Sequence, residues 1–91
     1  MYYVYILESG KDDKFYIGYT ADLERRIYEH RNGRARATKN RLPMTLVYYE
    51  AYLNQKDATG REMFLKSGSG HRFVKKQLVN YLASKKNIQK F

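Results

Sequence analysis

The sequence contains no cysteine, no tryptophan and only one proline. The absence of cysteine excludes disulfide bonds, a thiolate zinc site and a thiol nucleophile. No apolar segment approaches the roughly 20 residues that span a bilayer. The residues after Met1 form a strand-like run and lack the basic and apolar parts of a signal peptide. We therefore expect a soluble, cytoplasmic protein with no membrane partner.

Acidic residues are scarce: nine stand against 18 lysines and arginines, which gives a net charge of +9 over 91 residues. An excess of this size indicates a polyanionic partner, because each cation that neutralises a phosphate releases a condensed counterion. A charge that serves solubility, or attraction to anionic lipid, is the alternative explanation. Of these explanations, the composition favours a nucleic-acid partner.

The pattern along the chain predicts an α/β protein with three antiparallel strands, helices packed on the sheet, and the order β-β-α-β-α-α. Thr20 is the expected cap of the first helix. We expect one domain over residues 1–83 and a basic, flexible tail over residues 84–91. The expected strands are 2–8, 14–19 and 44–53, and the expected helices are 21–30, 55–67 and 71–83.

Two tyrosines lie on neighbouring predicted strands. Strand alternation places Tyr5 with Tyr3 and Leu7 on one face, and Tyr16 with Gly18 on one face of the next strand. If the hairpin aligns these faces, the two phenols lie close together, and Gly18 leaves room for a substrate backbone. Ordinary cross-strand aromatic packing is the alternative, since the chain has ten tyrosines.

The first predicted helix contributes a cation and an imidazole. His30 shares an apolar stripe with Leu23 and Ile27, and Arg26 lies at the edge of that stripe. A partly buried guanidinium needs a carboxylate or a phosphate as its partner. Arg26 could also extend past the core into solvent, and His30 could be a packing residue.

The second predicted helix contributes an anion. Glu62 shares a stripe with Ala58 and Leu65, so its carboxylate faces inward and needs either an arginine or a metal ion. Mg²⁺ and Mn²⁺ use few carboxylates and complete their shells with water and phosphate oxygens. Lys66, beside it, could neutralise phosphate. With the tyrosines, Arg26 and His30, this set suits phosphodiester hydrolysis.

These residues carry a resemblance to a known family. Tyr3-Val4-Tyr5 followed by Tyr16-Ile17-Gly18 resembles the GIY-YIG signature, with Tyr3 in place of the usual first glycine. The segments 16–30, 46–50 and 61–66 are similar to that family's strand-to-helix element, third strand and metal-binding helix. The resemblance spans nearly the whole chain and is greatest to small, free-standing bacterial members.

The resemblance implies a single GIY-YIG-type domain that cuts DNA with one Mg²⁺ or Mn²⁺ ion, in DNA repair or recombination. By position, Tyr5, Tyr16, Arg26 and His30 are the implied catalytic residues, and Glu62 is the implied metal ligand. Which tyrosine acts as the general base stays open. Asn80 is not assigned, although the family often has a late asparagine near the site.

A basic loop over residues 34–41 is expected to contact the phosphate backbone. The full set of expected nucleic-acid contacts is Gly18, Arg34, Arg36, Lys39, Arg41 and Lys66. A mobile loop with no such role is the alternative. For the whole chain, the alternatives to a nuclease are a non-catalytic nucleic-acid-binding module and a subunit that needs a protein partner for specificity.

Overall fold

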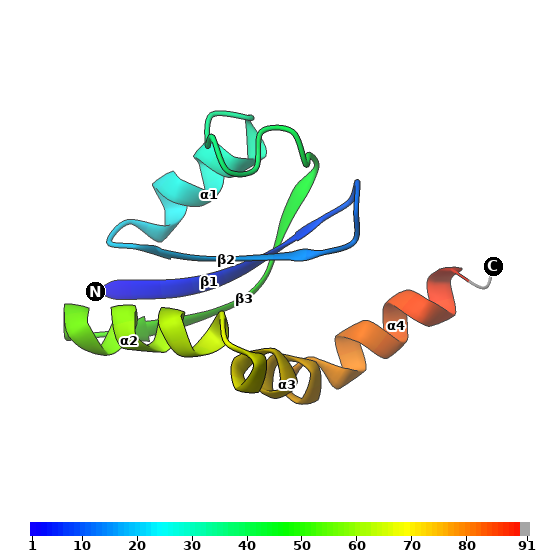
Figure 1. Cartoon of the computed structure of the whole chain (residues 1–91). Coiled ribbons are helices and arrows are strands. Elements are labelled where there is room, and N and C mark those ends of the chain that lie inside the picture. Colours follow the sequence, from blue (N-terminus) through cyan, green and yellow to red (C-terminus); the bar gives the residue numbers. More distant parts are fainter. Residues whose placement is uncertain (90–91) are drawn as a thin grey trace.

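A three-stranded antiparallel sheet in the order β2-β1-β3 separates two helical layers (Figure 1). The computed structural model describes residues 1–89, with side chains described through Lys85. Helix α1 covers one face of the sheet, and α2 and α3 cover the other. The elements are β1 (Tyr2–Ser9), β2 (Phe15–Thr20), α1 (Leu23–Arg31), β3 (Met44–Tyr52), α2 (Gln55–Leu65), α3 (Gly68–Gln77) and α4 (Val79–Gln89).

Alternation along β1 divides the core into two clusters, as the sequence predicts. Tyr5 and Leu7 pack with Ile27 of α1, whereas Val4 and Ile6 face the layer of α2 and α3. Both faces of β1 are therefore buried, because it is the central strand. The α1 face holds the residues of the predicted site that come from β1, β2 and α1.

A β-bulge interrupts the pairing of β1 with β3. Ile6 pairs with Tyr48 and Leu7 with Leu46, so Val47 has no partner opposite it. A bulge changes which side chains share a face. Leu46 and Tyr49 consequently both lie on the α1 side, although strict alternation would place them on opposite faces.

The other face is tied to α2 by a charged network. Glu50 of β3 accepts both hydrogen bonds of a bidentate pair from Arg61, at 2.9 and 3.0 Å, and also accepts from the hydroxyls of Tyr48 and Tyr52. The guanidinium of Arg61 lies 4.4 Å from the ring centroid of Phe73 in α3. Arg61 thus connects three elements and has a structural role.

The predicted fold class is confirmed, and several helix boundaries differ from those predicted. Asp22, rather than Thr20, caps α1 by accepting from the backbone N–H of Arg25. Ser67 caps α3, so residues 68–70, which were expected to separate two helices, form the first turn of α3. The single helix predicted over 71–83 is two helices, because α3 ends at Gln77, Leu78 is its C-cap, and α4 begins at Val79.

Helix α4 extends away from the sheet and contacts the β1–β2 hairpin through one buried carboxylate (Figure 1). Glu8 accepts hydrogen bonds from the hydroxyl of Tyr81 and the ammonium group of Lys85. The helix continues to Gln89, past the boundary expected at Ala83. Residues 90–91 of the predicted tail lie outside the described residues. Among residues 1–89, no helix is long and apolar enough to cross a bilayer.

Gly18 offers a test of this packing. A Cβ atom there would lie 2.9 Å from Cε2 of Tyr5 and closer still to its Cζ and hydroxyl oxygen, whereas a Cβ at Gly60 would meet nothing within 4 Å. We expect Gly18→Ala to lower the free energy of unfolding by about 1–3 kcal/mol. Gly60→Ala, in a helix interior, should raise it by about 0.5–1 kcal/mol. Urea unfolding measures both, and equal stability of the two variants would contradict the packing described.

Candidate functional site

The phenol of Tyr5 lies at the centre of the α1 face. Tyr5 pairs with Gly18 across the β1–β2 ladder, and its ring occupies the space that a side chain at position 18 would fill. The space expected to admit a substrate backbone therefore holds this ring instead. The ring of Tyr16 lies diagonally beside it, with centroids 6.4 Å apart. The two motif tyrosines share a face, as predicted.

His30 joins this pair from the last turn of α1. Its Nε2 lies 2.8 Å from the Tyr5 hydroxyl oxygen, and its Nδ1 lies 2.6 Å from Oγ1 of Thr38. The imidazole is fully buried, and its ring centroid is 5.3 Å from that of Tyr16. In either tautomer of a neutral ring, one nitrogen donates and the other accepts. Tyr5, His30 and Thr38 therefore form a continuous hydrogen-bonded chain.

Burial sets the protonation states of this chain. Burial, assisted by the nearby charge of Arg26, lowers the pKa of His30 to about 4, so the imidazole is neutral at pH 7. Burial also raises the pKa of Tyr5 to about 12, and the Arg26 guanidinium opposes part of this rise. The phenol thus keeps its proton in the free protein and has a neutral imidazole as a partner.

Arg26 lies at the edge of the cluster. Its side chain is 34% exposed, and its Nη1 donates to Oε1 of Glu29 at 3.0 Å. Arg25 points outward with 76% of its side chain exposed. The sequence predicted that Arg26 lies at the edge of the core, and the carboxylate that its partly buried guanidinium needs is Glu29. Arg26 is close enough to Tyr5 to affect its pKa while one side of its guanidinium remains open to solvent.

Glu62 approaches from α2, which covers the opposite face of the sheet. Its side chain is 21% exposed and pairs with Lys66 at 3.0 Å. The carboxylate is still near enough to raise the pKa of Tyr5. Because β2 is an edge strand, groups from both faces can meet beyond its outer side. Lys66, expected to contact phosphate, has Glu62 as its partner in this structure.

The acidic residues around this cluster bear on metal binding. Within residues 1–89, no three histidines, cysteines or carboxylates come together to hold a metal ion. Glu62 is a single, partly accessible carboxylate. Mg²⁺ is commonly bound through one or two carboxylates, with water and substrate phosphate completing the shell. The residues present therefore fit an ion shared with a phosphate substrate, and they do not form an all-protein cage.

The basic loop over residues 34–41 is anchored rather than loose. Ala35 and Thr38 are buried, and the backbone N–H groups of Thr38 and Lys39 both donate to the carbonyl of Ala35. Thr38 was missed by the sequence reasoning, which treated the loop by its charges alone. The sequence did hold a signal, because the small side chains of Ala35 and Thr38 stand among the cations and are suited to buried positions in a loop.

The cations of this loop divide into two groups. Arg41 pairs with Asp12 at 2.8 Å and also donates to the backbone carbonyl of Lys14. It therefore fastens the loop to the β1–β2 hairpin, a role that the sequence did not indicate. Arg36 and Lys39 are exposed, and Arg34 lies over the ring of Tyr28 at 5.7 Å. Of the loop's cations, Arg36 and Lys39 are therefore the ones that we still expect to contact phosphate.

The fold and the cluster define a small α/β domain with a buried tyrosine–histidine pair in a basic protein. The GIY-YIG catalytic domain model matches residues 1–77. The chain belongs to the GIY-YIG family, which confirms the resemblance found in the sequence. That family is one of nucleases, so membership implies an interaction with nucleic acid.

The chain is also similar to individual proteins over most of its length. A UPF0213 protein of Clostridium perfringens is 40% identical over 86 residues, covering 93% of this chain and 86% of the relative. A UPF0213 protein of Haloquadratum walsbyi is 43% identical over 67 residues, covering 72% and 74%. The solution NMR structure of a UPF0213 protein from Bacillus halodurans has a TM-score of 0.52 at 42% identity, covering 89% and 85%. None of these names states an activity.

The buried imidazole makes a prediction about pH. His30 has a folded-state pKa of about 4, below the ordinary value of about 6.5. As the pH falls from 6.5 to 4, His30 becomes protonated in the unfolded chain but stays neutral in the folded protein. The free energy of unfolding therefore decreases across this pH range. We expect roughly 2–3 kcal/mol of the unfolding free energy to disappear between pH 7 and pH 4.

Urea unfolding at a series of pH values measures this loss. The His30→Gln variant is the control, because it keeps a polar side chain and has no proton to bind. Its unfolding free energy should change less between pH 7 and pH 4. Equal pH dependence in the two proteins would contradict a neutral, buried His30.

Proposed function

We propose that this chain is a divalent-metal-dependent DNA endonuclease that hydrolyses phosphodiesters beside Tyr5, in DNA repair or recombination. The proposal rests on the surroundings of the Tyr5 hydroxyl. It is hydrogen-bonded to a neutral imidazole, and Arg26 and Glu62 both act on its pKa. A hydroxyl that could pass a proton, a cation and a carboxylate that could hold a metal ion are thus near enough to interact electrostatically.

Tyr5 and His30 provide a route for the proton of the attacking water. With the imidazole proton on Nδ1, facing Thr38, Nε2 accepts the hydrogen bond of Tyr5. The phenol oxygen can then take a proton from water while its own proton passes to Nε2, leaving tyrosine neutral and an imidazolium behind. The negative charge of a bound phosphate favours that imidazolium, because it raises the pKa of His30. General base catalysis of this kind typically contributes 10²–10⁴-fold.

Arg26 would stabilise the charge that develops on the phosphoryl oxygens. Its guanidinium is fixed by Glu29 on one side and partly open on the other, so it can donate to phosphate without a large rearrangement. A guanidinium fixed in advance costs little reorganisation when charge develops in the transition state.

Glu62 is the residue that would hold the metal ion. A divalent ion there would polarise the phosphoryl oxygen and stabilise the leaving oxygen. Lys66 holds the carboxylate in the free protein and would have to release it, at least in part, when the ion binds. The ring of Tyr16 lies beside the rings of Tyr5 and His30 and would orient the substrate.

Two substitutions test the enzyme against a non-catalytic binding module or a subunit that needs a partner. We expect Glu62→Ala and Arg26→Ala each to lower the rate of DNA cutting by at least about 100-fold. Matched controls are Asp57→Ala, an exposed carboxylate on α2, and Arg25→Ala, an exposed neighbour on α1. Both controls should retain the wild-type rate.

The assay uses labelled duplex, single-stranded and branched DNA with Mg²⁺, Mn²⁺ or EDTA. Cutting that requires metal and is lost only in the Glu62 and Arg26 variants supports the enzyme. Full activity of Glu62→Ala would show that Glu62 is not the metal ligand. DNA binding without cutting in every condition would favour the binding module.

The basic loop gives a separate prediction about affinity. If Arg36 and Lys39 contact phosphates, the double variant Arg36→Ala, Lys39→Ala should reduce the slope of log affinity against log salt by about 1–2. Arg41→Ala should instead lower stability, because Arg41 pairs with Asp12 and so joins the loop to the hairpin. An unchanged salt slope in the double variant would reject phosphate contact by this loop.

A further inference from the structure

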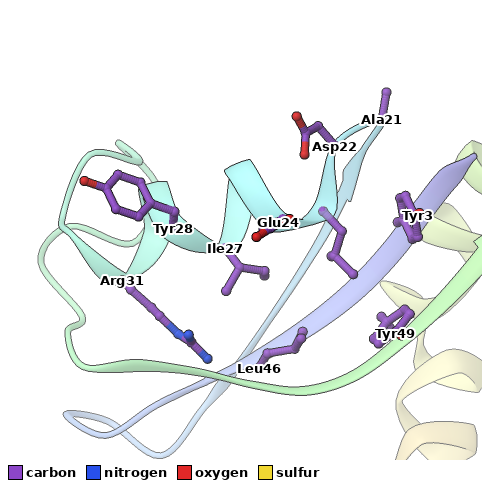
Figure 2. Close-up of a pocket in the computed structure, with 10 residues that line it drawn as sticks. Tyr3, Ala21, Asp22, Glu24, Ile27, Tyr28, Arg31, Leu46 and Tyr49 are labelled. Carbon is purple, nitrogen blue, oxygen red and sulfur yellow. The ribbon is translucent and has the colours of Figure 1, made fainter.

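A groove of about 660 Å³ lies between α1 and β3, on the side of α1 away from the edge strand β2 (Figure 2). Its floor is apolar and includes Leu23, Ile27 and Leu46. The cluster around Tyr5 and His30 does not line it. Its volume lies within the range typical of ligand-binding clefts.

The two ends of the groove differ in chemistry. Arg31 extends into it at one end, and the rings of Tyr3 and Tyr49 meet edge to face at the other, with centroids 6.2 Å apart (Figure 2). Tyr49 is 53% exposed, which is unusual for a large aromatic side chain on a sheet face covered by a helix. The β-bulge at Val47 is the reason that Tyr49 and Leu46 both line this groove.

We propose that this groove binds unpaired nucleotides of single-stranded DNA, with a base stacked on Tyr49 and a phosphate paired with Arg31. The inference rests on the proposed nucleic-acid substrate and adds a second contact surface to it. Aromatic rings beside a cation are the arrangement that binds single strands, because every base has a stacking face and every nucleotide a phosphate. The net charge of +9 attracts the same ligand to the protein as a whole, whereas the groove itself is lined by the acidic Asp22 and Glu24 and the basic Arg31.

The carboxylate of Glu24 sets a preference among bases. Glu24 lies between the two ends of the groove (Figure 2). A carboxylate accepts hydrogen bonds from the exocyclic amino groups of cytosine, adenine and guanine, whereas an unpaired thymine offers only its ring N3–H. The groove should therefore bind oligo-dC more tightly than oligo-dT.

The chain contains no tryptophan, so one introduced indole reports on one place. Tyr49→Trp keeps a stacking surface in the groove, and Leu53→Trp places an indole at an 86% exposed position just beyond β3. Both proteins are titrated with short oligo-dC, oligo-dT and an abasic sugar-phosphate strand of equal length. EDTA is present throughout, so the DNA stays intact and the result does not depend on cutting.

We expect oligo-dC to quench the Tyr49→Trp emission, oligo-dT to do so at higher concentration, and the abasic strand to leave it unchanged. The Leu53→Trp emission should not respond. By anisotropy with labelled oligo-dC, Tyr49→Ala should weaken binding by about tenfold, whereas Tyr49→Phe should bind as the wild type does. Arg31→Gln should reduce the salt slope by about 0.7.

Several results would overturn the proposal. These are unchanged Tyr49→Trp emission with every strand, equal quenching by the abasic strand, or equal quenching of Leu53→Trp. Emission that changes with protein concentration in the absence of DNA would show instead that a second copy of the chain covers the groove. The proposal would then fail while DNA cutting at Tyr5 could persist. Quenching of Tyr49→Trp by oligo-dC in EDTA, together with no cutting in the separate assay with Mg²⁺ or Mn²⁺, would support binding in the groove and reject the endonuclease.

Discussion

The fit of the Tyr5 ring over Gly18 is the constraint on which the rest of the site depends. It brings the phenol oxygen within 2.8 Å of His30 and removes both groups from solvent. Desolvation then keeps the imidazole neutral and the phenol protonated. Packing therefore fixes the protonation states as well as the geometry, and Thr38 on the anchored loop completes the chain.

Much of the fold follows from local pattern. Strand alternation separated Tyr5 from Val4, and helical spacing placed Ile27 and His30 inward with Arg26 at the edge, as the structure shows. These features depend on residues close together in the sequence. The break between α3 and α4 at Leu78 was missed, because residues 71–83 form one plausible helical run and no proline or glycine marks the end of α3.

The features that sequence could not supply depend on contacts between distant residues. Thr38 forms a hydrogen bond with His30 only because the loop folds back onto α1. Arg41 forms an ion pair with Asp12, which lies 29 residues earlier in the sequence. The bulge at Val47 decides which side chains of β3 face α1, and nothing in the run Thr45-Leu46-Val47-Tyr48 marks it. Whether a cation is available to a ligand or used internally is thus a property of the tertiary structure.

In the proposed mechanism, the Tyr5 hydroxyl handles a proton during DNA cutting. The most direct measurement is the metal-dependent cutting rate of Tyr5→Phe, since this variant keeps the ring over Gly18 and removes only the oxygen. The account predicts a folded protein that binds DNA with unchanged affinity and cuts it at least about 100-fold more slowly. A Tyr5→Phe protein that cuts at the wild-type rate would contradict it.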